Sequence, residues 1–284
     1  MKILLTGGTG FIGSAVLDHL VDAGHHVTAI VRNQKSSLAV QDAGATGIIG
    51  DLFDAEWLAS ELRQHDGAIH TAAGSDDRDI ALNDAVIDAA LAAFGGTTKP
   101  FVHTGGIWIY GSNASISEGD ELDSPALTQW RTAGEQRLLD SDVRASVVQP
   151  GIVYGHGKGI PAMLRDAVDG NRVALIGSGD QHWTSVHVDD LANLYVRALE
   201  KAPGGRAYVG ASGQNPTVRE LGEALVGAVV PESREATLER LGGFGEALLL
   251  DQQASGARAK TELGWEPSRQ SLVEALREGY PAAA

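Results

Sequence analysis

Three glycines near the start of the chain have a spacing that is typical of a dinucleotide-binding site. Gly7, Gly10 and Gly13 stand three residues apart, after a short apolar stretch and at the start of a helical pattern. Glycines in such a turn let the backbone approach a pyrophosphate, while the helix N-terminus offers unpaired N–H groups to the anion. We therefore expect cofactor contacts from Gly7, Thr9, Gly10, Phe11, Ile12 and Gly13. The alternative is an ordinary glycine-rich turn.

Two basic residues after the next strand are candidates for recognising a phosphate of the cofactor. In a Rossmann-type unit, an acidic residue at the end of the second strand binds the ribose hydroxyls of NAD, whereas a basic residue binds the 2′-phosphate of NADP. Here Val31 stands where the acid is usual, and Arg32 and Lys35 follow it. The pattern favours NADP(H) as the cofactor. The alternative is that both cations are solvated surface charges.

Apolar patterns around these residues define the elements that would position them. Ile3 to Leu5 fit a short buried strand, and Gly24 ends a helix before "HHVTAIV" begins the next strand. The helix between the strands has an apolar stripe at helical spacing, formed by Ala15, Val16, Leu20 and Val21. The first half of the chain continues this alternation, so the sequence predicts an α/β fold with a Rossmann-type doubly wound parallel sheet.

Several motifs give the chain a resemblance to a known superfamily. "TGGTGFIG" is similar to the TGxxGxxG turn of short-chain dehydrogenases/reductases, and "FVHTGGIWIYG" and "VVQPGIVYG" resemble strands that carry their active site. "VHVDDLA" and "LGWEP" are close to motifs in the second half of those proteins. Over nearly its whole length the chain resembles the extended or atypical members, the NAD(P)-dependent epimerase/dehydratase-like family.

This resemblance implies further contacts with a bound dinucleotide. In family members the ends of later strands bracket the adenine and lie beside the rest of the cofactor. The corresponding positions are Asp51 and Leu52 for the adenine, Ala72, Ala73 and Gly74 beside the cofactor, and Pro150 at the nicotinamide face. The small residues in this set would let a dinucleotide lie flat on the strand ends.

The catalytic residues that the resemblance implies are replaced in this chain. Family members use a Tyr-x-x-x-Lys pair on one helix face, in which tyrosine is the acid/base, lysine lowers its pKa, and a nearby Ser or Thr binds the reacting oxygen. Glu135 matches the glutamate that commonly follows this pair. Aligned on it, "LTQWRTAGE" has Leu127 at the tyrosine position and Arg131 at the lysine position. Gly106 stands at the hydroxyl position.

Three interpretations of this replacement are open from sequence. In the first, Arg131 replaces lysine as the anchor of the nicotinamide ribose, and the proton comes from a water or another side chain. The candidate side chains are Thr104, Tyr154 and His156, the last because imidazole titrates near neutral pH. In the second, an insertion or deletion lets another tyrosine, such as Tyr110, serve. In the third, the protein binds NADP(H) without turnover, like redox-sensing relatives.

Residues around the expected nicotinamide favour a small apolar substrate. Gly105 and Gly106 enlarge this space and present backbone N–H groups that can polarise a carbonyl. Ile152 stands where sugar-nucleotide enzymes of the family often have Asn, and we expect apolar walls from Trp108, Trp130 and Trp183.

The leading hypothesis is therefore an enzyme, an NADP(H)-dependent oxidoreductase that reduces a C=O, C=N or activated C=C bond. The alternative from another class is a non-catalytic NADP(H)-binding regulator. A sugar-nucleotide epimerase or dehydratase is the third possibility.

Composition and charge narrow the possible partners. The 284 residues carry a net charge of −15 and no cysteine, which argues against nucleic-acid binding and leaves no disulfide or zinc–thiolate site. His182 and His187 lack a third ligand at metal-binding spacing, so no metal site is expected. No apolar run reaches the roughly 20 residues that span a bilayer, and no signal peptide is evident. We expect a cytoplasmic monomer or homodimer that acts on a small molecule.

The order of patterns predicts two lobes. Residues 1–155 should form the NADP-binding Rossmann domain, to which residues 183–212 return. Residues 156–182 and 213–284 should form a smaller C-terminal substrate-binding lobe. Asp189 and Asp190 fit the N-terminus of a helix. "LGGFGEALLLD" fits either a hinged flap over the substrate or a turn into a packed helix.

Overall fold

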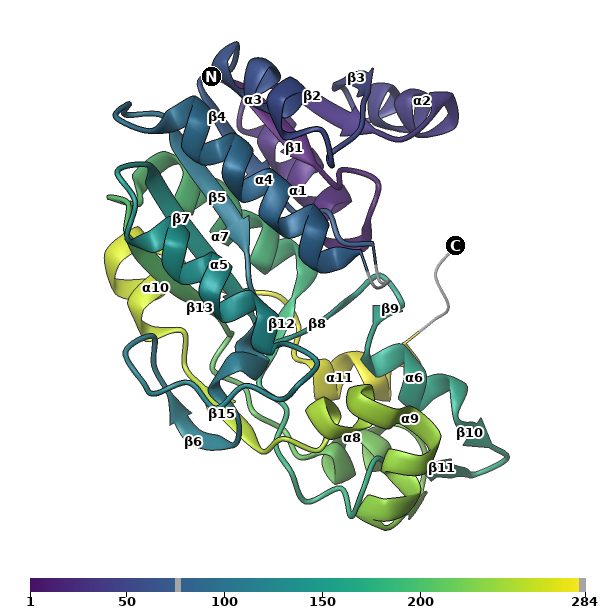
Figure 1. Cartoon of the computed structure of the whole chain (residues 1–284). Coiled ribbons are helices and arrows are strands. Elements are labelled where there is room, and N and C mark those ends of the chain that lie inside the picture. The colour runs from purple at the N-terminus through teal and green to yellow at the C-terminus, as the bar shows by residue number, and fades with distance from the viewer. Residues whose placement is uncertain (75–77, 281–284) are drawn as a thin grey trace.

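The largest element of the protein is a seven-stranded parallel sheet (Figure 1), seen in a computed structural model that describes residues 1–74 and 78–280. In spatial order the strands are β3 (Thr46–Ile49), β2 (His26–Val31), β1 (Lys2–Thr6), β4 (Gly67–His70), β5 (Pro100–Thr104), β7 (Arg144–Pro150) and β13 (Arg206–Gly210). The chain order reverses at β1, which pairs with β2 on one side and β4 on the other. The predicted doubly wound parallel sheet is therefore confirmed. Folds of this class bind ligands at such a reversal.

Helices cover both faces of this sheet, which explains why its strands read as continuous apolar runs. Ile3 and Leu5 of β1 belong to the core on one face, whereas Leu4 belongs to the core on the other. The first face carries α1 (Phe11–Asp22), α2 (Gln34–Asp42) and α7 (Val188–Lys201), and α1 packs against α7. The second carries α3 (Ala55–Arg63), α4 (Asp79–Phe94) and α5 (Gln129–Leu139). In the described part of the chain, no helix has the length and hydrophobicity required to cross a membrane.

The smaller lobe lies below the large sheet in Figure 1 and has its own apolar core. The short strands in and beside this lobe are β6 (Asn113–Ile116) with β15 (Gln252–Ala254), β8 (Ile152–Gly155) with β9 (Lys158–Gly159) and β12 (Ser185–His187), and β10 (Val168–Asp169) with β11 (Arg172–Ala174) and β14 (Ala228–Val230). Its helices are α6 (Pro161–Asp166), α8 (Val218–Leu225), α9 (Arg234–Leu248) and α11 (Leu272–Arg277).

The two lobes exchange chain more often than the expected boundaries allow. The helix α10 (Ala257–Leu263) and Trp265 pack in the core of the large sheet, beside α7, although we expected residues 213–284 in the small lobe. The Trp265 indole N–H donates to the Asp190 carbonyl at 2.8 Å. The Asp190 carboxylate accepts the N–H groups of Ser268 and Arg269. This acid at the start of α7 therefore also fastens the C-terminal segment to the large domain.

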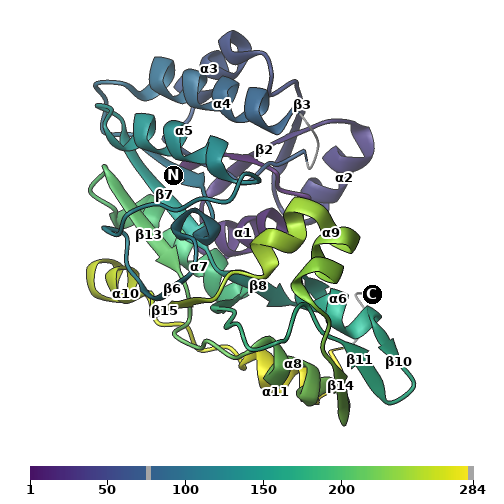
Figure 2. The same cartoon turned by 60° about the horizontal axis from the view of Figure 1, so that its bottom comes forward.

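The stretch "LGGFGEALLLD" forms the second half of α9 up to Leu248 and the three residues after it. The helix breaks at Gly242, where φ is 55° and ψ is −138°, and Figure 2 shows the two halves at an angle. After the break, the Phe244 ring meets the Trp108 ring edge-on, with centroids 5.9 Å apart. This segment is a packed helix with a glycine at its bend.

Candidate active site

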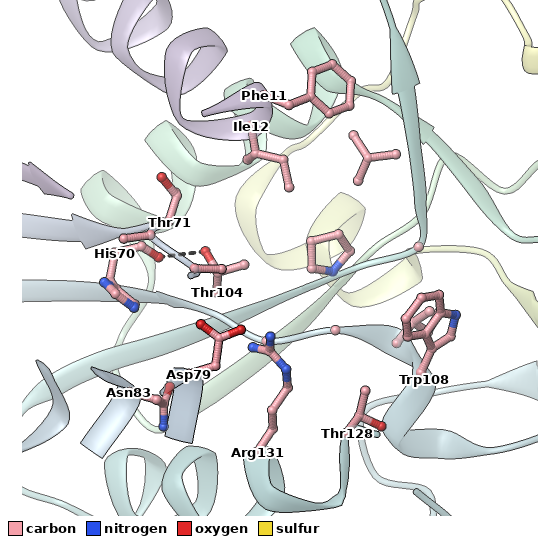
Figure 3. Close-up of a pocket in the computed structure, with 18 of the residues that line it drawn as sticks. Phe11, Ile12, His70, Thr71, Asp79, Asn83, Thr104, Trp108, Thr128 and Arg131 are labelled. Atoms are coloured by element: carbon pink, nitrogen blue, oxygen red, sulfur yellow. Dashed lines mark hydrogen bonds between the residues drawn. The ribbon is translucent and has the colours of Figure 1, made fainter. Parts of the chain in front are cut away.

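A pocket of about 340 Å³ opens at the carboxyl ends of β1, β4, β5 and β7, beside the reversal of strand order (Figure 3). Both lobes line it. The aromatic and branched aliphatic residues of its lining are Phe11, Ile12, Leu82, Ile107, Trp108, Trp130, Ile152, Val153 and Ile160. Asp79 and Arg131 are the charged residues of the described lining, and their side chains lie next to each other in Figure 3. The pocket therefore suits a largely apolar molecule with one polar end.

The glycine turn after β1 wraps tightly around the end of β4. Gly7 has a φ of +78°, and a Cβ atom on it would lie 2.6 Å from the Ala72 nitrogen. A Cβ atom on Gly13 would lie 2.0 Å from the Gly7 carbonyl oxygen and 2.5 Å from Thr71 Oγ1. Gly10 is the N-cap of α1 and provides no side-chain cap, so the first N–H groups of this helix are available to an anion.

Most of the residues predicted to contact the cofactor outside its adenosine half lie together around this turn. The pocket lining includes Phe11, Ile12, Ala72, Ala73 and Pro150. Thr9 is exposed on the glycine turn. Gly74 follows Ala73 and is exposed, with its N–H directed to the Asp79 carboxylate.

The residues predicted to hold the adenosine half lie outside the pocket, where β2 and β3 end side by side. The Gly50 N–H after β3 donates to the Val31 carbonyl at 3.1 Å, which brings the next residues of both strands close together. Arg32 and Lys35 are exposed, and their side chains form no hydrogen bond or ion pair with any described residue. Two unpaired cations at this edge leave their charge available to a phosphate.

Asp51 and Leu52 follow Gly50 at the same edge. Asp51 is exposed, and its carboxylate accepts the Phe53 N–H at 3.0 Å. Leu52 is half-buried and packs on the core of the second sheet face. Outside the apolar pocket, this edge of the sheet thus holds Arg32, Lys35, Asp51 and Leu52.

Arg131 lies in the pocket wall, in contrast to Leu127. The helix α5 begins at Gln129, so Leu127 precedes it, and the Leu127 side chain is 41% exposed and is not part of the described lining. The Arg131 guanidinium carbon lies 4.4 Å from the centre of the Trp130 ring. Burial lowers the pKa of Arg131, whereas the charges of Glu135 and Asp79 oppose that shift. A guanidinium remains cationic under such a shift.

Of the three candidate proton donors, Thr104 alone reaches the pocket. Its Oγ1 donates to the His70 carbonyl at 2.6 Å, and because a hydroxyl has one hydrogen, the Tyr195 hydroxyl at 2.7 Å must be the donor to Thr104. The Thr104 proton is therefore already engaged in the structure.

Tyr154 and His156 lie away from the pocket lining. Tyr154 is 1% exposed in the core of the small lobe, and its hydroxyl donates to the Gln270 carbonyl at 2.7 Å. His156 is exposed, and its Nε2 lies 2.9 Å from Asp189 Oδ1. Ile152 and Val153 of β8 line the pocket, whereas the Tyr154 side chain packs in the small-lobe core and His156 lies in the turn after β8.

Comparison with known proteins agrees with this architecture. The model of the NAD dependent epimerase/dehydratase family matches residues 3–210. The chain belongs to this family. Among its relatives is the uncharacterized protein C2A9.02 of Schizosaccharomyces pombe, 32% identical over 291 residues, which cover 97% of this chain and 98% of that protein. The 2-alkyl-3-oxoalkanoate reductase of Stenotrophomonas maltophilia is 31% identical over 254 residues, or 81% of this chain and 76% of that protein.

Solved structures show the same fold. The human epimerase family protein SDR39U1 (isoform 2), solved with NADPH, superimposes with a TM-score of 0.74 at 23% identity and covers 98% of both chains. Other solved proteins of similar fold contain NAD. The fold therefore agrees with the assignment to the NAD dependent epimerase/dehydratase family, and relatives of the chain include named reductases.

In this epimerase/dehydratase-family chain, two glycines that follow β5 line the pocket. A Cβ atom on Gly106 would meet nothing within 4 Å, so the missing hydroxyl leaves open space in the pocket. The Gly105 N–H donates to the Val148 carbonyl, whereas the Gly106 N–H has no acceptor among the described residues. Trp108 and Trp130 line the space as expected. Trp183 instead lies in the small-lobe core, where its indole donates to the Leu248 carbonyl at 3.0 Å.

The sequence did not reveal a buried acid behind the pocket. Glu135 is 4% exposed and lies against Gly105, where a Cβ atom would be 2.5 Å from Glu135 Oε1. Gln149 Nε2 donates to Glu135 Oε2 at 2.8 Å, while Oε1 has no partner among the described residues. Burial raises the pKa of Glu135 to about 7, although Gln149 and Arg131 act in the other direction. Tyr110 is buried in the same network and donates to Gln149 at 2.8 Å.

Asp79 and Asn83 are further residues that no motif indicated. Both belong to α4, and Figure 3 shows them below His70 on the same side of the pocket as Arg131. His70 and His103 stack beneath the pocket with ring centres 5.2 Å apart. Burial lowers the pKa of His70 to about 3 and that of His103 well below its usual range, so both rings are neutral. A local pattern could not have found these residues, because His70 and His103 meet through the pairing of β4 with β5 and the two α4 residues reach the pocket through tertiary packing.

Proposed function

We propose that the protein is an NADP(H)-dependent oxidoreductase that reduces a C=O, C=N or activated C=C bond of a small apolar molecule. The observation that carries this proposal is one pocket in which a glycine turn at the start of α1 meets an apolar wall and the guanidinium of Arg131. A Cβ atom at Gly7 or Gly13 would clash with neighbouring backbone, so only glycine fits there. Because these positions carry no side chain, the backbone of the turn can approach a phosphate closely, as dinucleotide binding requires. The reductase among the relatives gives further support.

A bound nicotinamide would supply the hydride. The protein would have to hold the reacting atom and balance the negative charge that develops on it. The unpaired Gly106 N–H and the Arg131 guanidinium are the donors that the pocket offers for this purpose. Arg131 would also anchor the nicotinamide ribose, with Pro150 at the nicotinamide face.

The proton would come from water that enters the pocket. Thr104 already donates to His70, and neither Tyr154 nor His156 is in the described lining. We therefore exclude Tyr154 and His156 from the proposed mechanism. Thr104 would act as a packing residue that fixes Tyr195 and the end of β5.

The wild-type protein should bind NADPH at least tenfold more tightly than NADH, a difference of about 1.4 kcal/mol. Arg32→Ala should weaken NADPH binding by roughly 10- to 100-fold, because a charge-assisted phosphate contact is lost. NADH binding should not change in this variant. Calorimetric titration of both cofactors, or nicotinamide fluorescence, measures these affinities.

Arg234→Ala is the matched control, because Arg234 is an exposed arginine on α9, far from the ends of β2 and β3. It should bind NADPH like the wild type. Equal affinity of the wild type for NADH and NADPH would refute the assignment of the phosphate site. If neither cofactor bound, the oxidoreductase proposal itself would fail.

The second candidate is a non-catalytic NADP(H)-binding regulator. It is favoured by the exposed position of Leu127 and by the engaged proton of Thr104. Purified protein with NADPH and a panel of ketones, imines and enones separates the two functions. Cofactor oxidation with any member supports the enzyme, whereas saturable NADPH binding without oxidation supports the regulator. Ile152 in the lining speaks against a sugar-nucleotide substrate.

A further inference from the structure

One wall of the pocket is a tight β-hairpin that comes from the small lobe. β8 and β9 pair antiparallel, with Tyr154 opposite Gly159 and Gly155 opposite Lys158. The two turn residues, His156 and Gly157, have φ values of 50° and 69°, as a two-residue hairpin turn requires. Val153, Gly159 and Ile160 of this hairpin and its continuation line the pocket.

The hairpin also touches the start of α1. A Cβ atom on Gly159 would lie 3.1 Å from Phe11 Cε1 and 2.1 Å from the Val153 carbonyl oxygen. Gly159 has a φ of +88°, which favours glycine. Any movement of β9 relative to β8 would therefore change the distance between the pocket wall and the helix that begins at Phe11.

The Tyr280 hydroxyl is inserted between the two strands of this hairpin. It accepts the Gly155 N–H at 2.8 Å and donates to the Lys158 carbonyl. Gly155 and Lys158 face each other next to a two-residue turn, where the N–H of one normally bonds directly to the carbonyl of the other. The hydroxyl thus bonds to both strands at this pair and fixes their relative position at that point.

Tyr280 is held in place from several directions. Its side chain is 2% exposed in the small-lobe core, after α11 ends at Arg277. Its φ of +35° is unusual for a residue with a side chain, and its N–H bonds to the Ala275 carbonyl at 3.1 Å. Arg165 Nη1 donates to the Gly157 carbonyl at 2.9 Å and lies 3.4 Å from the Tyr280 carbonyl oxygen.

A strained backbone that several contacts fix together marks a position where the structure depends on the side chain. We propose that Tyr280 is a positioning residue that sets the width of the pocket at its nicotinamide end, through the β8–β9 hairpin. The inference rests on the proposed function for what occupies the pocket. Its geometric basis is the hydroxyl inserted between Gly155 and Lys158, in a hairpin whose next residues form the wall.

The test compares Tyr280→Phe with Tyr208→Phe. Both remove one hydroxyl from a buried tyrosine, but Tyr208 lies on β13, where its hydroxyl bonds to Glu262. Hydrogen–deuterium exchange of residues 153–160 reports on the hairpin. Titration with NADPH probes the whole site, and titration with adenosine 2′,5′-bisphosphate probes only the adenosine edge.

In Tyr280→Phe, the Gly155 amide should exchange faster, and NADPH should bind about tenfold more weakly, since two hydrogen bonds that fix the wall are lost. Adenosine 2′,5′-bisphosphate should bind as tightly as to the wild type. Tyr208→Phe should match the wild type in all three measurements. This combination cannot arise from general destabilisation, which would weaken both ligands.

Three results would overturn the inference. They are unchanged exchange at Gly155, unchanged NADPH affinity in Tyr280→Phe, or equal weakening of both ligands. If wild-type protein does not bind NADPH, the proposed function fails, and the role of Tyr280 in holding cofactor fails with it. Exchange at Gly155 would then still decide whether the hydroxyl fixes the hairpin, so the two failures are distinguishable.

Discussion

Gly13→Ala should reduce NADPH affinity by roughly 100-fold or more, about 2.7 kcal/mol. The added methyl group would lie 2.0 Å from the Gly7 carbonyl oxygen and 2.5 Å from Thr71 Oγ1. The Gly7 oxygen belongs to backbone directly after β1, which cannot move without disturbing the central strand. The start of α1 would have to move instead, and its free N–H groups would no longer meet the pyrophosphate. Overpacking of this kind also costs about 1–3 kcal/mol of stability.

Gly119→Ala is the control for this variant. Gly119 has no neighbour within 4 Å of an added Cβ atom and no positive φ, so the change should alter stability by no more than about 0.5 kcal/mol. Calorimetric titration with NADPH and thermal unfolding of both variants measure the two effects. Wild-type affinity in Gly13→Ala would show that the glycine turn is not where the cofactor binds.

The first half of the fold was predictable because local rules determine it. Buried parallel strands must be apolar on both faces, helices between them must carry one apolar stripe, and only glycine fits where Gly7 and Gly13 touch neighbouring backbone. Each rule leaves a pattern within about ten residues of sequence. The parallel sheet and the family follow from such patterns, and the structure and comparisons confirm them.

The small lobe was less predictable because its contacts join distant parts of the chain. Trp265 and α10 return to the core of the large sheet, and no pattern in their own sequence predicts that contact. The Tyr280 hydroxyl bonds to groups more than 120 residues earlier. Short strands and irregular loops have weak periodicity, so their partners are set by tertiary packing.

The side chains of the candidate site show the same limit. "VYGHGKG" shows that Tyr154 and His156 are near the pocket in sequence, but not that Tyr154 faces the other side of β8. Thr104 reaches the pocket, yet its hydrogen bond to His70 depends on the pairing of β4 with β5. In the sequence, Glu135 served only to align this helix with the Tyr-x-x-x-Lys pair of the family. Its burial depends on Gly105, which follows β5, and on Gln149, which belongs to β7.

The environment of Glu135 makes the stability of the protein dependent on pH. In the unfolded chain this carboxyl has an ordinary pKa of 4.5, whereas burial raises its pKa to about 7 in the folded protein. Between these values the folded state binds more protons than the unfolded state, so the stability falls as pH rises through this window. Once the pH is well above 7, the loss of stability levels off at about 3 kcal/mol. Below pH 4.5 the group contributes no loss, because it is protonated in both states.

Glu135→Gln should therefore stabilise the protein at high pH. The amide oxygen can accept the hydrogen bond from Gln149 Nε2, and no charge has to be buried against Gly105. The stability difference between variant and wild type should increase by about 2 kcal/mol from pH 5.5 to pH 8, since most of the ionisation falls in that interval. Urea unfolding at both pH values measures this difference.

Glu239→Gln provides the matched control, because Glu239 is exposed on α9 and the substitution changes the same group there. Its effect on stability should not differ between pH 5.5 and pH 8. If Glu135→Gln shows an equally constant effect, Glu135 does not bury a charge in the folded protein. A pH-dependent gain instead identifies the acid behind Gly105 as a destabilising charge. That charge would lie next to the pocket and help to hold Arg131 in its cationic form.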